Sequence, residues 1–254
     1  MKQNIILWIA AAVITFLAGF LQSRINQNYP VSGSFGIEGK EIGYKLDKVY
    51  YGNDDYRFFI TTEIDSLTGI VIWKKPDYVQ WESSELVHRG KLMIGKIPHQ
   101  QPLTKIEYLI KLKYKNKEYT ILPGNKAVAI TFFDSVPASI NFYYMFTLLG
   151  GLLLAIRTGL EFFKIPGKIK TLNIFTLIFF IVNVFAFHPL KTTYELGMVG
   201  KGAIPITEMF QLSSILLFIT WALATALIFN TKKYRAWALS SAVITILIFE
   251  LGNF

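Results

Sequence analysis

Long apolar segments and one polar block divide the chain. Five runs of mainly apolar residues are long enough to cross a bilayer, whose hydrocarbon core of roughly 30 Å requires about 20 helical residues. These runs cover residues 4–22, 138–156, 171–187, 210–229 and 236–251. Their apolar residues are consecutive, whereas the strands of a membrane β-barrel alternate between apolar and polar residues. The pattern therefore predicts five transmembrane helices, one before the polar block and four after it.

The polar block, residues 23–136, has the alternation that is typical of β-strands. Within Lys105–Tyr114, apolar residues occupy every second position, so one face of this strand is expected to be buried. Further strands are expected at residues 42–51, 56–64, 69–73, 78–81, 91–97 and 127–133. About seven or eight short strands separated by turns are typical of an immunoglobulin-like sandwich. The predicted fold class is a mixed membrane protein, with this all-β sandwich inserted between helices 1 and 2.

Three domains are predicted: an N-terminal anchor (1–22), a β-domain (23–136) and a four-helix transmembrane domain (137–254). Residues 23–39 are polar and contain several glycines, which indicates a flexible tether. The first apolar run has a second interpretation, as a cleavable signal peptide with Lys2 in its charged region. Its apolar core of about 17 residues exceeds the usual 7–15, and no typical cleavage site follows, so a retained anchor is favoured.

Charge is concentrated in the β-domain, which holds 29 of the 43 charged residues, 16 basic and 13 acidic. The chain is only 17% charged and has no cysteine, which argues against a soluble cytosolic enzyme, a disordered regulator and a disulfide scaffold. Of the net charge of +9, the β-domain contributes +3. The remainder lies beside the apolar runs, where it can contact lipid headgroups. The lipid bilayer is therefore an expected partner, and nucleic acid is not.

Basic residues near the ends of the predicted helices indicate their orientation. Eight of them share one side of the membrane: Lys2, Arg157, Lys164, Lys168, Lys170, Lys232, Lys233 and Arg235. Lys191 and Lys201 are the basic residues in the short segments of the other side. The positive-inside rule then places the N-terminus in the cytoplasm, and residues 23–136 and the C-terminus outside it.

Short motifs follow the last predicted strand. They are the F-x-x-x-V-P segment that begins at Phe132, the aromatic run Phe142–Phe146, and Arg157–Glu161. Over about residues 95–195 the chain resembles a loose group of uncharacterised bacterial inner-membrane proteins, which pair an extracytoplasmic β-domain with a following helix bundle. The resemblance implies this architecture and a bacterial inner-membrane location. It implies no activity, cofactor or catalytic residue.

Sequence motifs for common chemistry are absent from the chain. We find no nucleotide-binding, zinc-protease, serine-hydrolase or dinucleotide-binding pattern. The three histidines, His88, His99 and His188, are too dispersed to suggest a metal site. The sequence predicts no catalytic residue, no cofactor and no metal.

Three groups of residues remain as candidate sites. Five polar residues fall at one predicted depth on the outer side: His188, Tyr194, Glu195, Glu208 and Glu250. Such groups can bind a cation, relay protons, or simply lie at headgroup level. Arg157 and Glu161 are four residues apart and can pair, as a functional intramembrane charge pair or as an interfacial anchor. The partner-binding candidates are the aromatic residues Trp73, Tyr78 and Trp81, although sandwich cores also bury such residues.

The favoured functional hypothesis is a non-enzymatic subunit of a cell-envelope complex. Its extracytoplasmic β-domain is expected to bind a membrane or envelope protein, or to assist assembly. The first alternative is a small transporter or channel component. The second, less favoured, is a membrane enzyme that acts on lipid or envelope glycan at the outer face.

Overall fold

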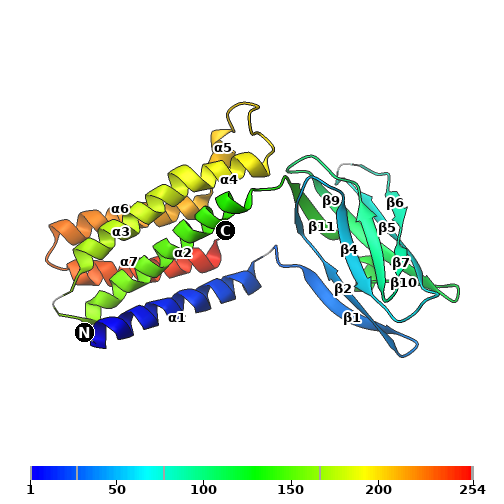
Figure 1. Ribbon diagram of the computed structural model, residues 1–254, viewed down its shortest axis with the longest axis horizontal. Helices are drawn as coiled ribbons and strands as arrows, with labels where there is room; N and C mark the ends of the chain where they lie inside the picture. The colour runs from blue at the N-terminus through cyan, green and yellow to red at the C-terminus, as the bar shows by residue number, and fades with distance from the viewer. Residues whose placement is uncertain (1, 27, 77, 166, 253–254) are drawn as a thin grey trace. The chain divides into compact units, whose positions relative to one another are not determined.

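The computed structural model describes residues 2–26, 28–76, 78–165 and 167–252, which form two compact units (Figure 1). The helical unit comprises Met1–Gln27, Val136–Tyr194 and Met198–Phe254. The β unit comprises Asn28–Ser135 together with Glu195–Gly197. The prediction that a β-sheet region lies between the first helix and the later helices is confirmed.

The helical unit contains the five predicted apolar runs as helices. Its α-helices are α1 (Lys2–Ile25), α2 (Ala138–Leu160), α3 (Ile169–Val182), α4 (His188–Glu195), α5 (Ile206–Met209), α6 (Leu212–Asn230) and α7 (Tyr234–Leu251). A 3₁₀ turn, Glu161–Phe163, continues α2, and a π-helical turn, Asn183–Phe187, joins α3 to α4. The segments long and apolar enough to cross a membrane are Lys2–Arg24, Ala138–Phe163, Ile169–Glu195, Leu212–Asn230 and Tyr234–Leu251. The third extends beyond its predicted end because the π turn carries the helix into α4.

Helix α2 lies at the centre of the helical unit, where it packs against α1, α3 and α7. Helix α6 completes the bundle by contacting α3 and α7 (Figure 1). The core between these helices includes Tyr144, Phe180 and Trp221, whose side chains are fully buried. Since each helix is apolar on nearly all sides, the side chains that face outward are also apolar, as in a bundle surrounded by lipid.

The β unit consists of two sheets. Its strands are β1 (Val31–Ile37), β2 (Lys40–Leu46), β3 (Val49–Tyr51), β4 (Tyr56–Thr61), β5 (Thr68–Lys74), β6 (Glu82–Glu85), β7 (Val87–Arg89), β8 (Leu92–Ile97), β9 (Lys105–Tyr114), β10 (Lys117–Thr120) and β11 (Val128–Phe133). We call the sheet with the order β1-β2-β4-β8-β7 sheet A. Sheet B has the order β3-β11-β9-β5-β6, and β10 also pairs with β9. A short 3₁₀ turn, Pro123–Asn125, precedes β11.

Side chains from the inner faces of both sheets form one core. The predicted alternation in β9 is confirmed, because Ile106, Tyr108, Ile110 and Leu112 are all buried. On β4, Tyr56, Phe58 and Ile60 are buried in the same way. Phe58 lies directly opposite Gly95 of β8, where its ring occupies the space that a Cβ atom would need.

Three segments differ from the sequence prediction. The expected tether 23–39 contains strand β1, because Val31–Ile37 pairs along its whole length with β2. The expected strand 42–51 is two strands, since the chain leaves sheet A after Leu46 and β3 pairs with β11 in parallel within sheet B. Residues 78–81 are not a strand, and the extended segment begins at Glu82 instead.

The two faces of β9 should respond very differently to the same substitution. Ile110→Asp would bury an unpaired carboxylate in the core of the β unit, at a cost of several kcal/mol. Lys111→Asp on the opposite face should change the stability by less than about 0.5 kcal/mol. Limited proteolysis of the 254-residue protein in detergent measures this directly. We expect cleavage throughout the β unit of the first variant and the wild-type pattern for the second, whereas equal damage would contradict the assigned faces.

Candidate functional site

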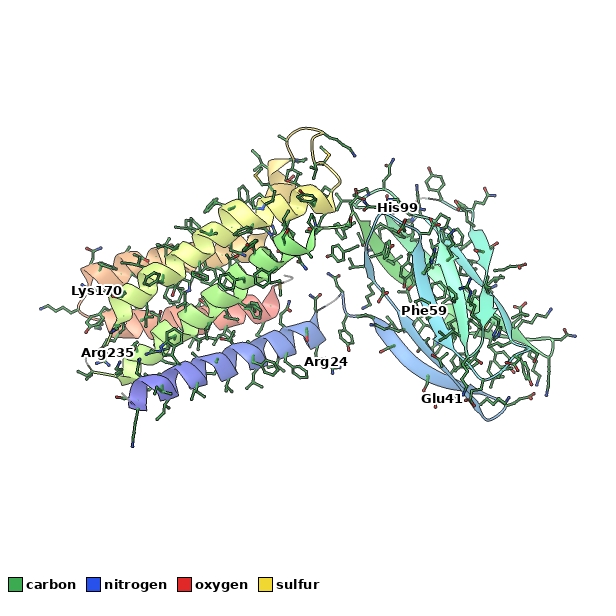
Figure 2. All side chains as sticks on the ribbon, viewed as in Figure 1. Arg24, Glu41, Phe59, His99, Lys170 and Arg235 are labelled. Atoms are coloured by element: carbon green, nitrogen blue, oxygen red, sulfur yellow. The ribbon has the colours of Figure 1, made fainter. Side chains whose placement is uncertain are left out.

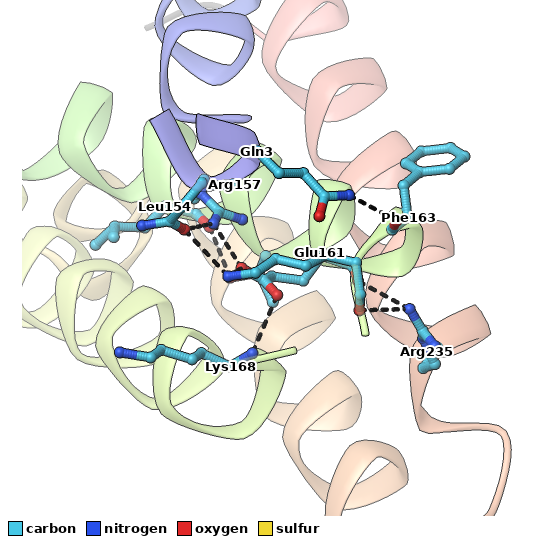
Figure 3. Close-up of polar contacts among 10 residues, drawn as sticks. Gln3, Leu154, Arg157, Glu161, Phe163, Lys168 and Arg235 are labelled. Carbon is cyan, nitrogen blue, oxygen red and sulfur yellow. Dashed lines mark hydrogen bonds and ion pairs between the residues drawn. The ribbon is translucent and has the colours of Figure 1, made fainter. Parts of the chain in front are cut away.

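The Arg157–Glu161 pair lies inside the helical unit. Arg157 Nη2 is 2.5 Å from Glu161 Oε1, and both side chains are only 1% exposed (Figure 3). The pairing follows from the i, i+4 spacing on α2 and the turn that continues it. Because both side chains are buried, the ion pair does not lie on the surface of the helical unit. A buried ion pair must be fully coordinated to offset the cost of removing two charges from water.

Helix α1 and the residue before α3 supply part of that coordination, while Arg157 Nε and Nη1 are buried without a hydrogen-bond partner among the described residues. Asn4 of α1 accepts a hydrogen bond from Arg157 at 2.7 Å, and the Arg157 guanidinium lies 5.3 Å from the centre of the Trp8 ring. The second oxygen of the Glu161 carboxylate accepts the backbone N–H of Lys168, immediately before α3, at 3.0 Å. A carboxylate is favourable there because a helix N-terminus carries positive partial charge.

Arg235 connects α7 to the same place. Its guanidinium donates to the backbone carbonyls of Glu161, Phe162 and Lys164, at 3.2, 2.5 and 2.7 Å (Figure 3). These carbonyls belong to a helix end, where such groups have no partner within the helix. Asn4, Arg157, Glu161 and Arg235 thus join α1, α2 and α7 to one another and to the residue before α3, at one end of the bundle.

Hydrogen bonds between side chains also join neighbouring helices farther along the bundle. Asn173 of α3 donates to Thr225 of α6 at 2.8 Å, and Trp221 of α6 donates to Thr245 of α7 at 2.7 Å. In the π turn, Asn183 donates to the Tyr144 carbonyl of α2 at 3.0 Å. Polar side chains of this kind hold apolar helices together where lipid offers no hydrogen bonds.

The five residues predicted on the outer side lie in different surroundings. His188 is buried as the first residue of α4, and its Nε2 accepts the Gln211 N–H at 3.1 Å. Tyr194 is half-buried near the end of α4, and Glu208 is exposed on α5. Glu195 belongs to the β unit, where its carbonyl accepts the Asp134 N–H at 2.9 Å.

Glu250 is half-buried near the end of α7, with one carboxylate oxygen that is buried and has no hydrogen-bond partner among the described residues. Within the part of the chain that the structure describes, no three histidine, cysteine or acidic side chains gather as a metal site would require.

Of the three aromatic residues predicted to bind a partner, one lies in the core of the β unit and two lie on its surface. Trp73 is 5% exposed within the core of the β unit, so it is not available to a partner. Tyr78 and Trp81 are exposed after β5, and the ammonium groups of Lys75 and Lys74 lie 5.8 and 5.2 Å from their ring centres. Cation–π contacts of this kind already occupy one face of each ring.

A hollow on the outward face of sheet A was not anticipated from the sequence. It measures about 520 Å³ and lies over β1, β2 and β4. It is lined by Ser32, Gly33, Gly43, Tyr44, Lys45, Asp47, Arg57, Phe58, Phe59 and Thr61. Phe59 of β4 is one of these lining residues, and half of its surface is exposed (Figure 2).

Phe59 belongs to a row of three apolar residues on β4, β8 and β7 of sheet A. Strand pairing places Phe59 opposite Ile94, and Ile94 opposite Val87, which is 58% exposed. The sequence indicates that Phe59 points outward, because Phe59 alternates along β4 with the buried residues and shares its side of the strand with Arg57 and Thr61. We call this row, with the hollow beside it, the open face of sheet A.

Basic side chains border the open face. Lys96 pairs with Asp55 at 2.6 Å, and this contact, with a hydrogen bond from the His99 N–H, holds the pKa of the Asp55 carboxyl below its ordinary value. Lys45 and Arg57 make no ion pair with any residue that the structure describes. Two positive charges are therefore available beside an exposed aromatic ring.

Comparison with known proteins gives little further information. No protein-family model matches the chain, and no curated protein sequence matches it. The crystal structure of a Br derivative of BhCBM56 aligns with a TM-score of 0.25 and 12% sequence identity. The alignment covers 41% of this chain and 94% of that one. A likeness of this size assigns neither fold nor function.

Removing one member of the buried ion pair should destabilise the helical unit strongly. Glu161→Leu leaves the Arg157 charge without its partner and the Lys168 N–H without its acceptor, for which we expect a loss of about 3–5 kcal/mol. The double variant Arg157→Met with Glu161→Leu should recover most of this loss, because no unpaired charge remains. Thermal unfolding in detergent measures both. A double variant less stable than Glu161→Leu would contradict this account of the pair.

Proposed function

We propose that the protein is a non-enzymatic, membrane-anchored binding subunit that presents its β unit to a partner protein of the bacterial cell envelope. The observation that carries this proposal is the open face of sheet A. An exposed apolar row beside a hollow of about 520 Å³ is unusual on a solvated sheet face, where outward residues are ordinarily polar.

The surroundings of the open face favour a particular chemistry in the partner. Phe59 offers an apolar contact, and Lys45 and Arg57 offer positive charge within the same hollow. A partner that inserts an apolar side chain flanked by carboxylates complements both features. Aromatic and arginine residues at the centre of an interface commonly supply most of its binding energy.

We further infer that the β unit is immunoglobulin-like. Apart from β1, sheet A has the order β2-β4-β8-β7, and sheet B contains β11-β9-β5. This corresponds to the A-B-E-D and G-F-C orders of immunoglobulin domains. The buried Trp73 on β5 supports the correspondence, because the third strand of such domains often carries a buried tryptophan.

A transporter or channel component remains the second candidate function. Asn173, Asn183 and Ser214 are fully buried in the helical unit, and each has a side-chain oxygen with no hydrogen-bond partner among the described residues. Buried polar atoms between apolar helices are also used along substrate and ion pathways. The experiments below separate this function from partner binding, which depends on the β unit.

Phe59 and Arg57 should be required for binding. A photo-crosslinking amino acid at Phe59 should capture the partner in native membranes, and one at Ser83 on sheet B should not. Phe59→Ala and Arg57→Glu should each weaken binding of the captured partner by about tenfold or more. Tyr78→Ala is the matched control, because this exposed aromatic residue lies outside the open face. Full binding by Phe59→Ala would exclude this surface.

The proposed inner-membrane topology has the N-terminus in the cytoplasm and the β unit outside. The chain has no cysteine, so a single introduced thiol can be labelled without background. Lys117→Cys on β10 should react with an impermeant maleimide in cells whose outer membrane is permeabilised. Lys168→Cys, before α3, should react only after lysis. The reverse pattern would invert the topology and exclude a periplasmic partner.

A further inference from the structure

Strand β1 forms an open edge of sheet A. It pairs with β2 along one side, and no strand pairs with its other side in the described part of the chain (Figure 1). It is seven residues long, VSGSFGI, without a charged residue or a proline. Ser32, Ser34 and Gly36 are exposed. Proteins usually shorten, charge or cover such an edge, because its free backbone groups invite another strand.

The other edges of the β unit are protected in these ways. Strands β3 and β7 are three residues long, and β6 and β10 are four. Charged residues also occupy three of these strands, namely Glu82 and Glu85 on β6, Arg89 on β7, and Lys117 and Glu118 on β10. Strand β1 is therefore the exception among the described edges.

The turn before β2 determines which backbone groups of β1 are free. Glu38 and Gly39 both have positive φ, 49° and 83°, and form the two-residue turn between the directly paired Ile37 and Lys40. Hydrogen-bonded and non-hydrogen-bonded pairs alternate from this point along an antiparallel ladder. The N–H and C=O groups of Ser32, Ser34 and Gly36 consequently point away from β2, toward the open edge.

We propose that β1 pairs antiparallel with the β1 strand of a second copy of this chain, about a two-fold axis through Ser34. In this register Ser34 faces Ser34 of the second copy, and Ser32 faces Gly36 in both directions. The free N–H and C=O groups of Ser32, Ser34 and Gly36 then form hydrogen bonds with the second copy. The strand carries no charge, so no like charges meet across the interface.

The inward side chains complement each other in the same register. Phe35 of one copy faces Gly33 of the other, and Val31 faces Ile37. The space over Gly33 is occupied by the Tyr44 ring of the same chain, so the second Phe35 meets this ring and not the Gly33 backbone. Within one chain the Tyr44 ring lies over Gly33 and 6.5 Å from the Phe35 ring, so a second Phe35 extends an existing aromatic cluster.

Alternative registers are less favourable. An axis through Phe35 places two phenylalanines opposite each other, and an axis through Gly33 leaves two glycines opposite each other. Both shorten the overlap. The proposed pairing uses the edge of sheet A and leaves its open face free, so it does not rest on the proposed partner-binding function.

A single cysteine tests the proposal. In the 254-residue chain, which has no cysteine, Ser34→Cys can form a disulfide only with another molecule. Directly opposite Cα atoms in the proposed pair are about 5.5 Å apart, within the range that a disulfide spans. Mild oxidation of native membranes should convert most of the protein to a dimer of twice 29.0 kDa on a non-reducing gel.

Gly36→Cys is the matched control on the same strand and face. A Cβ atom at this position has room, with its nearest neighbour at 3.9 Å. Its counterpart in the second copy lies four residues along the strand, roughly 14 Å away, so this variant should not form a dimer with itself. Co-expressed Ser32→Cys and Gly36→Cys chains with different tags should form the mixed dimer.

Ser34→Lys tests the edge without a crosslink. It places two ammonium groups beside each other at the axis, and the dimer should be lost in light scattering of the detergent-solubilised protein while the wild type keeps it. Three results would overturn the proposal: no dimer for Ser34→Cys, equal dimer formation by Gly36→Cys, or a Ser34→Cys adduct with a different protein in place of the dimer. The last result would assign the edge to a foreign strand.

Discussion

The helical unit depends on the burial of one carboxylate. Glu161 is held by the Arg157 side chain and by the backbone N–H before α3, while its own carbonyl accepts from Arg235 of α7. Asn4 adds α1 through Arg157. Two charges inside an apolar bundle are costly unless they are paired with each other. The contacts around this pair also join four helical segments at one end of the bundle.

The β unit is stabilised differently, because the core between its two sheets is apolar. Inward side chains of both sheets fill one core, and small or aromatic residues on the outward side of sheet A leave a hollow beside Phe59. The edge strand β1 contributes Ser32 and Gly33 to that hollow while leaving its own backbone groups unpaired. The two proposed contact surfaces, the side chains of the open face and the backbone edge of β1, therefore lie next to each other on sheet A.

Much of the architecture could be predicted from the sequence because it arises from local patterns. Continuous apolar runs indicated the five membrane-length helices, and period-two alternation indicated β9. Strand β1 was missed because VSGSFGI has few residues that favour strands, and it is held by pairing with β2. The spacing of Arg157 and Glu161 predicted their contact, but their burial depends on distant residues such as Asn4 and Arg235. The alternation in β4 predicts that Phe59 points outward. The hollow beside it could not be predicted, because residues of neighbouring strands also line it.

The π turn Asn183–Phe187 determines which side chains of α4 face inward. The buried positions of α3 are Ile169, Asn173, Thr176 and Phe180, a regular α-helical stripe. Continued without interruption, that stripe would bury Phe187, Lys191 and Tyr194. The wider turn adds one residue and rotates all that follows by about 100°, so the buried residues of α4 within the helical unit are His188 and Thr192. The extra residue thus shifts the helical register by one position, and the inward side of α4 carries an imidazole and a hydroxyl in place of aromatic and basic side chains.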